Sequence, residues 1–119
     1  MHKKSIHIAI DKAESLVDFF EFCGYLVVNL RCLSLSEVEE RGVDGIEVII
    51  FDPYIEYLQN DTLTTIEVFS ERNPCIKLIA LNSLIFHDDE LEEMQQKGFF
   101  SLFDMATAKL EDIHKVVAA

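Results

Sequence analysis

Two aspartates stand directly after apolar runs of the sequence and could do chemistry together. Asp11 follows the run 5–10, and Asp52 follows the almost unbroken apolar run 46–51. If both runs are parallel strands, their carboxyl ends meet at one edge of the sheet, where two carboxylates could hold a hard cation such as Mg²⁺ through oxygen ligands. Asp52 could also act as a nucleophile toward a phosphoryl group.

Each of these residues also has a plain structural interpretation. Asp11, with Glu14 three residues later, could serve as the N-cap and part of a capping box for a helix. Asp52 precedes Pro53 and could end a strand and open a turn. Asn82 and Ser83 follow another apolar run at the same expected edge, and both residue types also favour ordinary turns.

The elements that must position these residues are five apolar runs that alternate with helical patterns. This alternation predicts a parallel sheet covered on both faces, in an α/β, flavodoxin-like, doubly wound fold with strand order 2-1-3-4-5 and five helices. The strands are expected at 5–10, 25–30, 46–51, 76–81 and 99–103.

Helical periodicity and end signals fix the expected helices. The first carries Leu16, Phe19, Phe20 and Cys23 on one face and ends at Gly24; the others are expected after Ser34, around 63–69, at 88–98 and at 107–117. Ser34 and Glu37 form a capping-box pattern, which predicts that the second helix begins there and stops near Gly42.

Composition bounds the function. The chain has 119 residues, half of them hydrophobic, and this predicts a single domain over 1–119. A net charge of -12 repels nucleic acid, so no DNA or RNA partner is expected. No apolar run reaches the ~20 residues of a membrane helix, which predicts a cytoplasmic protein without membrane contact.

The cysteines and histidines do not have the spacing of a metal site or a disulfide framework. We expect the cysteines to be buried free thiols. The residues concerned are Cys23, Cys32 and Cys75, and His2, His7, His87 and His114.

Two stretches, 45–52 and 73–81, resemble the third and fourth strands of the receiver domain of bacterial two-component response regulators, and the resemblance covers nearly the whole chain. It implies that Asp52 is the phosphorylated residue and that Asp11 is one of the two acidic residues that hold Mg²⁺ after the first strand. The neighbours of Asp11, Ile10 and Lys12, are not acidic, so the acidic pair is incomplete.

Other family features are also missing. The hydroxyl residue that contacts the phosphoryl group in receivers falls on Asn82, with Ser83 one place later, and these two are the candidate phosphate contacts. The lysine that receivers carry after the fifth strand is absent, because no Lys occurs from 98 to 108. A Pro-Gly pair shortly after the phosphoacceptor is missing too.

These observations favour a pseudo-receiver that serves as a protein-interaction or dimerisation module, through the face made by the fourth helix, the fifth strand and the fifth helix. The alternative is a working receiver that a histidine kinase phosphorylates on Asp52 with Mg²⁺. A small enzyme or cofactor binder on the same fold is less favoured, because no glycine-rich nucleotide loop follows a strand. Apart from weakly held Mg²⁺, no cofactor is expected.

Overall fold

Five parallel strands form the central sheet of the structure, a computed structural model that describes residues 4–11, 13–31, 33–53, 62–82, 92, 96, 100–104 and 107–119. The strand order is β2-β1-β3-β4-β5, which confirms the predicted order. The strands are β1 (Ser5–Ala9), β2 (Leu26–Asn29), β3 (Val48–Phe51), β4 (Lys77–Asn82) and β5 (Ser101–Asp104).

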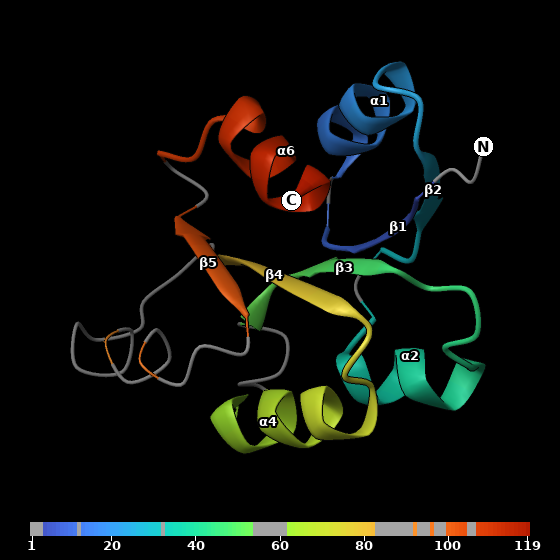
Figure 1. Ribbon diagram of the computed structural model, residues 1–119, viewed down its shortest axis with the longest axis vertical. Coiled ribbons are helices and arrows are strands. Elements are labelled where there is room, and N and C mark those ends of the chain that lie inside the picture. The colour runs from blue at the N-terminus through green and yellow to red at the C-terminus, as the bar shows by residue number, and fades with distance from the viewer. Residues whose placement is uncertain are drawn as a thin grey trace.

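Two helices cover each face of this sheet in the described part of the chain (Figure 1). They are α1 (Glu14–Phe22), α2 (Leu35–Arg41), α4 (Thr62–Arg72) and α6 (Leu110–Ala118). The helix expected at 88–98 lies outside the described residues apart from Glu92 and Gln96, so only four of the five predicted helices are described. Figure 1 places α1 and α6 on one face and α2 and α4 on the other.

Two hydrophobic clusters hold these layers together, one on each face of the sheet. All four residues of β3 are buried, and because side chains alternate along a strand, β3 contributes to both clusters. The α1/α6 cluster includes Ile8, Ile50, Phe20 and Ile113. The α2/α4 cluster includes Ile49, Leu78, Leu35, Ile66 and Phe69.

Local end signals set two helix boundaries as the sequence predicts. The Ser34 hydroxyl accepts a hydrogen bond from the Glu37 backbone N–H at 3.2 Å, and the Glu37 carboxylate accepts one from the Ser34 N–H at 3.3 Å. This capping box is complete. Gly24 adopts a φ of 94° just after α1, where its freedom from a Cβ permits the left-handed turn into β2.

Several expectations are wrong in detail, among them the last helix, which begins at Leu110 instead of residue 107. The N-cap of α1 is Ala13, without a side-chain cap, so Asp11 does not cap this helix; it lies in a turn that ends before the helix begins. The fifth strand ends at Asp104 instead of Phe103, because pairing with β4 sets its end. Cys75 is exposed in the turn before β4 and Cys23 is half-buried, while Cys32 lies outside the described residues.

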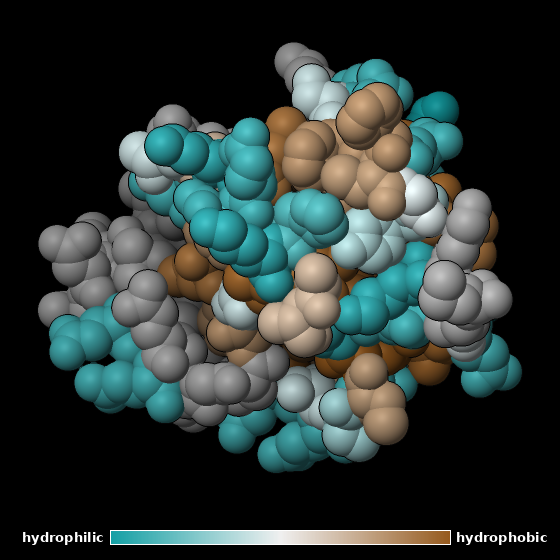
Figure 2. All heavy atoms as spheres, turned by 45° about the horizontal axis from the view of Figure 1, so that its top comes forward, coloured by the Kyte–Doolittle hydropathy of each residue, from teal (hydrophilic) through white to brown (hydrophobic). Residues whose placement is uncertain are grey.

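The surface carries few large apolar side chains in the described part of the chain. The exposed ones are Phe22, Leu26, Val28 and Val68, and Phe22 is 91% exposed. Figure 2 shows hydrophobic side chains over the end of the molecule that holds α1, among many hydrophilic ones. In the described part of the chain, no helix has both the length and the apolar character needed to cross a membrane.

Candidate functional site

The carboxyl end of β3 brings Asp52 to the middle of the sheet edge. Phe51 pairs with Ala9 of β1 on one side and with Ala80 of β4 on the other. Asp52 follows directly, next to buried Pro53, and is itself only 9% exposed. It is therefore a largely buried residue at the end of a strand that has a neighbour on each side.

Asp11 lies at the same edge and is exposed. It follows β1 after the buried Ile10, so it stands about one residue further along than Asp52 in the register of these strands. β1 is followed by α1 on one face of the sheet and β3 by α4 on the other, and the ligand crevice of open α/β sheets is expected between two such strand ends.

The residues at this crevice fit Mg²⁺ only in part. Two carboxylates, Asp11 and Asp52, supply the oxygen ligands that a hard cation prefers. Among the described residues, no third Asp, Glu, His or Cys side chain lies where it could complete a three-ligand metal site with them. If bound, Mg²⁺ would be held by these two side chains, would keep several waters, and would offset negative charge on a phosphoryl group.

Of the two candidate phosphate contacts, only Asn82 lies within the described residues. Asn82 is the last residue of β4 and pairs with Asp104 of β5, so its backbone lies at the same edge as Asp52. Ser83 lies outside the described residues. Asp104 is exposed, and its carbonyl accepts hydrogen bonds from the N–H groups of Thr107 and Ala108 at 3.1 and 2.8 Å. The end of β5 thus carries a carboxylate near the place where the resemblance to receivers implies a lysine.

Sequence reasoning missed a polar cavity beside Asp11. The cavity has a volume of about 500 Å³ and lies at the carboxyl ends of β1 and β2. Its charged side chains within the described part of the chain are Asp11, Glu14 and Arg31. The sequence signal was present, because Arg31 follows the second apolar run as Asp11 follows the first, but only the structure shows that these two strand ends border one cavity.

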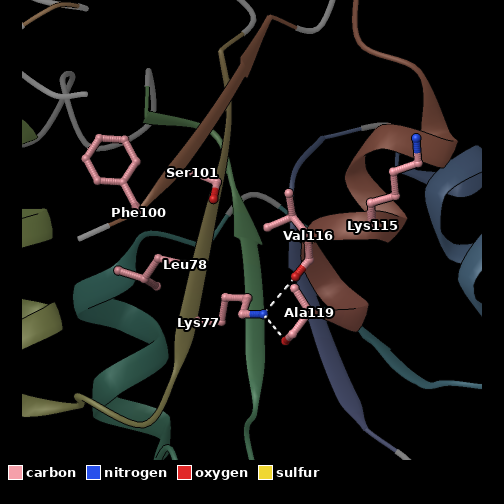
Figure 3. Close-up of a pocket in the computed structure, with 7 residues that line it drawn as sticks. All are labelled: Lys77, Leu78, Phe100, Ser101, Lys115, Val116 and Ala119. Atoms are coloured by element: carbon pink, nitrogen blue, oxygen red, sulfur yellow. Dashed lines mark hydrogen bonds between the residues drawn. The ribbon is translucent and has the colours of Figure 1, made fainter. Parts of the chain in front are cut away.

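A second pocket, of about 450 Å³, lies at the opposite edge of the sheet, between the start of β5 and the end of α6 (Figure 3). Lys77 reaches across it and donates hydrogen bonds to the carbonyls of Val116 and Ala119, each at 2.7 Å. Burial, reinforced by the nearby Lys4 ammonium, lowers the pKa of Lys77. Phe100, Ser101 and Lys115 are among the other lining residues.

The two described histidines have structural partners. His7, on β1, lies 3.3 Å from the Ser5 hydroxyl through Nδ1, and burial lowers its pKa. His114 Nε2 lies 3.0 Å from the Tyr25 hydroxyl. The rings of Phe19, Phe20 and Tyr25 surround His114 edge-on, so this histidine joins α6 to α1 and β2.

Comparisons by sequence identify little. No family model matches the chain. An inosose isomerase of Halalkalibacterium halodurans is 37% identical over 86 residues, which are 71% of this chain and 30% of that protein. The chain thus spans less than a third of the curated relative that it matches, and the activity of that longer protein does not carry over on this ground.

Comparisons by structure identify the fold. A two-component response regulator from Clostridium difficile has a TM-score of 0.72, 16% identity, and coverage of 97% of this chain and 93% of that one. A CheY-like receiver domain protein from Methanospirillum hungatei JF-1 has a TM-score of 0.69, 16% identity, and coverage of 98% and 92%.

A third structure adds a chemically informative relative. It is a response regulator from Burkholderia pseudomallei with a phosphorylated aspartic acid, a calcium ion and citrate; it is 17% identical, has a TM-score of 0.68, and is matched over 96% of this chain and 66% of that one. Together with the strand order, these likenesses show that the chain has the CheY-like receiver fold of two-component response regulators.

Proposed function

We propose that this chain is a receiver-like signalling domain with a degenerate phosphorylation site, which acts as a protein-interaction or dimerisation module in the cytoplasm. The observation that carries this proposal is the end of β5. Asp104 stands there, in register with Asn82, and no lysine occurs from residue 98 to residue 108. The fifth strand of this receiver fold thus ends in a negative charge, whereas a phosphoryl group needs a positive charge nearby.

The physical reason is electrostatic. A phosphoryl group on Asp52 would add negative charge at an edge that already carries the carboxylates of Asp11 and Asp104. Without a fixed cation from β5, only a bound metal ion would offset the repulsion. Metal held by two carboxylates is exchangeable, so the phosphorylated state would gain less stabilisation than in a receiver with its lysine.

An amide ¹H–¹⁵N spectrum, titrated with Mg²⁺ and then with beryllofluoride, tests the proposal. In the native chain we expect beryllofluoride to bind Asp52 too weakly for the shifts around it to saturate. Saturable shifts that cluster at Asp11 and Asp52 and vanish in Asp52→Asn would instead establish a working phosphoacceptor. Asp44→Asn serves as the matched control. Asp44 lies in an exposed turn before β3, at the amino-terminal ends of the strands, and the change removes the same charge there.

A working phosphoacceptor is the second candidate function, and the burial of Asp52 between β1 and β4 favours it. In this version a histidine kinase supplies the phosphoryl group, Asp11 and Asp52 hold Mg²⁺, and Asn82 or Ser83 contacts the phosphoryl oxygens. The phosphorylated aspartate and calcium ion of the Burkholderia pseudomallei relative support the chemistry for this fold. The same titration decides between the two candidates.

The interaction face of the proposed module includes β5 and α6. β5 ends the sheet order, so its outer edge has no strand neighbour in the described sheet. Beside it, the pocket of Figure 3 combines the apolar side chains of Phe100 and Val116 with the ammonium groups of Lys77 and Lys115. Such a surface suits a second signalling protein or a second copy of this chain.

Sedimentation at rising concentration tests the dimer version. If a dimer forms through this face, Lys115→Glu should weaken it, because Lys115 borders the pocket and its side chain is 80% exposed. Lys109→Glu makes the same charge change at the other end of α6 and should not. A dimer that dissociates in Phe22→Ser but not in Lys115→Glu would place the interface on α1 instead.

We propose no enzymatic role for the chain. The similarity to inosose isomerase covers 30% of that protein, so a catalytic site built over its whole length would be incomplete here. Conversion of an inosose by the purified chain would contradict a purely signalling role.

A further inference from the structure

The cavity beside Asp11 lies at the carboxyl ends of β1 and β2. The chain turns from β1 toward α1 on one face of the sheet and from β2 toward α2 on the other (Figure 1). In this strand order the usual ligand crevice of open α/β sheets lies between β1 and β3, so the cavity is a separate hollow on the β2 side of β1. Its lining residues within the described part of the chain are Ile10, Asp11, Ala13, Glu14, Asn29 and Arg31.

The charges around this cavity are of both signs. Asp11 and Glu14 bring carboxylates from the end of β1 and the first turn of α1, and Arg31 brings a guanidinium from the end of β2. All three side chains belong to exposed residues. In the described part of the chain none of them forms an ion pair, although opposite charges border the same space of about 500 Å³.

The position of Arg31 is fixed by its backbone. Its φ is 56°, in the left-handed region, and its N–H donates a hydrogen bond of 3.0 Å to the Asn29 side-chain oxygen. This turn places the Cα atom of Arg31 at the β2 side of the cavity. A ligand in the cavity would therefore meet negative charge on the β1 side and positive charge on the β2 side.

We propose that this cavity binds a free basic α-amino acid, such as L-arginine or L-lysine. Among the described lining residues, two carboxylates and one guanidinium match, group by group, a ligand with two cationic groups and one carboxylate. The ligand's α-carboxylate pairs with Arg31 in a bidentate manner, and its two cationic groups pair with Asp11 and Glu14. A simple anion would meet two carboxylates, and a simple cation would meet Arg31.

A titration of the ¹⁵N-labelled chain with L-arginine tests the proposal. Saturable shifts are expected at Asp11, Glu14, Asn29 and Arg31, and agmatine, which lacks the carboxylate, should bind at least about threefold more weakly, the size expected for one exposed ion pair. Sodium chloride at equal ionic strength should not reproduce these shifts. Equal binding of L-arginine and agmatine, the same shifts with salt, or no saturation below about 10 mM would each overturn the proposal.

Two variants separate ligand binding from general charge effects. Arg31→Gln should abolish the preference for L-arginine over agmatine, whereas Arg41→Gln removes the same charge from the exposed last turn of α2 and should preserve it. Equal behaviour of these variants would refute the role of Arg31. The site does not rest on the proposed signalling function, so Asp52→Asn should leave L-arginine binding intact whether or not Asp52 accepts a phosphoryl group.

Discussion

Under the proposed function, replacing Asp104 with lysine should favour the binding of a phosphoryl analogue at Asp52. Asp104 ends β5, and β4 lies between β5 and β3, so Asp104 and Asp52 are two strands apart in the register. With an interstrand spacing of about 4.8 Å and an offset of one residue, their backbone positions are about 10 Å apart. The Asp104→Lys change therefore moves the local charge by two units at a distance where electrostatics still matters.

The expected gain can be worked from this distance. Two unit charges about 10 Å apart interact by about 0.4 kcal/mol in water and about 1.7 kcal/mol at an effective dielectric constant of 20. Beryllofluoride adds one negative charge when it binds a carboxylate, so a two-unit change gives about 0.8 to 3 kcal/mol in favour of the complex before screening. Physiological salt, with a Debye length of about 8 Å, reduces this to the lower end, about 1 kcal/mol or fivefold in affinity.

The assay is beryllofluoride binding in the presence of Mg²⁺, followed by the amide spectrum of each variant. Asp104→Asn should give about half the gain in binding free energy of Asp104→Lys, because it changes the side-chain charge by one unit instead of two. Asp44→Lys makes the same net change at the opposite edge of the sheet and serves as the control, with thermal unfolding recorded for every variant. Binding by Asp104→Lys that is no tighter than binding by Asp44→Lys would refute the electrostatic reasoning.

Three further predictions concern stability. Ser34→Ala should lower the free energy of unfolding in urea by about 1 to 2 kcal/mol, because Ser34 is fully buried and caps α2, whereas Ser36→Ala on the exposed side of α2 should not lower it. Burial lowers the pKa of His7 below its ordinary 6.5, so the unfolded chain binds more protons than the folded chain as the pH falls through that range. Acidification should therefore lower the free energy of unfolding, and His7→Gln should lose less of it than the native chain. Tyr25→Phe, which removes the hydroxyl 3.0 Å from His114 Nε2, should cost about 1 kcal/mol and shift the His114 ring resonances; unchanged resonances would argue against that hydrogen bond.

Features encoded within a few residues were predictable from the sequence. The capping box of α2 needs only Ser34 and Glu37 at the right spacing, and the structure confirms it. The buried run of β3 and the strand order likewise follow from apolar patterning and the handedness of crossovers. Asp11 shows the limit, because the same local pattern predicted a cap that the path of the chain from β1 to α1 does not form.

Features that depend on neighbouring strands were harder to predict. The end of β5 is fixed by pairing with β4 and not by the run of phenylalanines, so the strand extends to Asp104. Arg31 offered no periodic signal, and its relation to Asp11 exists only because β1 and β2 are neighbours. The exposure of Cys75 follows from its turn after Pro74, which outweighs the usual tendency of a thiol to be buried.

The sheet order also determines how the two candidate sites relate. β1 lies between β2 and β3, so Asp11 borders the cavity on one side and stands beside the end of β3 on the other. A cation that engages Asp11 at the Asp52 crevice competes with an amino acid that engages it in the cavity, and linkage requires each ligand to weaken the other by the same factor. The coupling would pass through a single carboxylate and would need no movement of the sheet, so Asp11→Asn should remove it while leaving Arg31 and Asp52 in place.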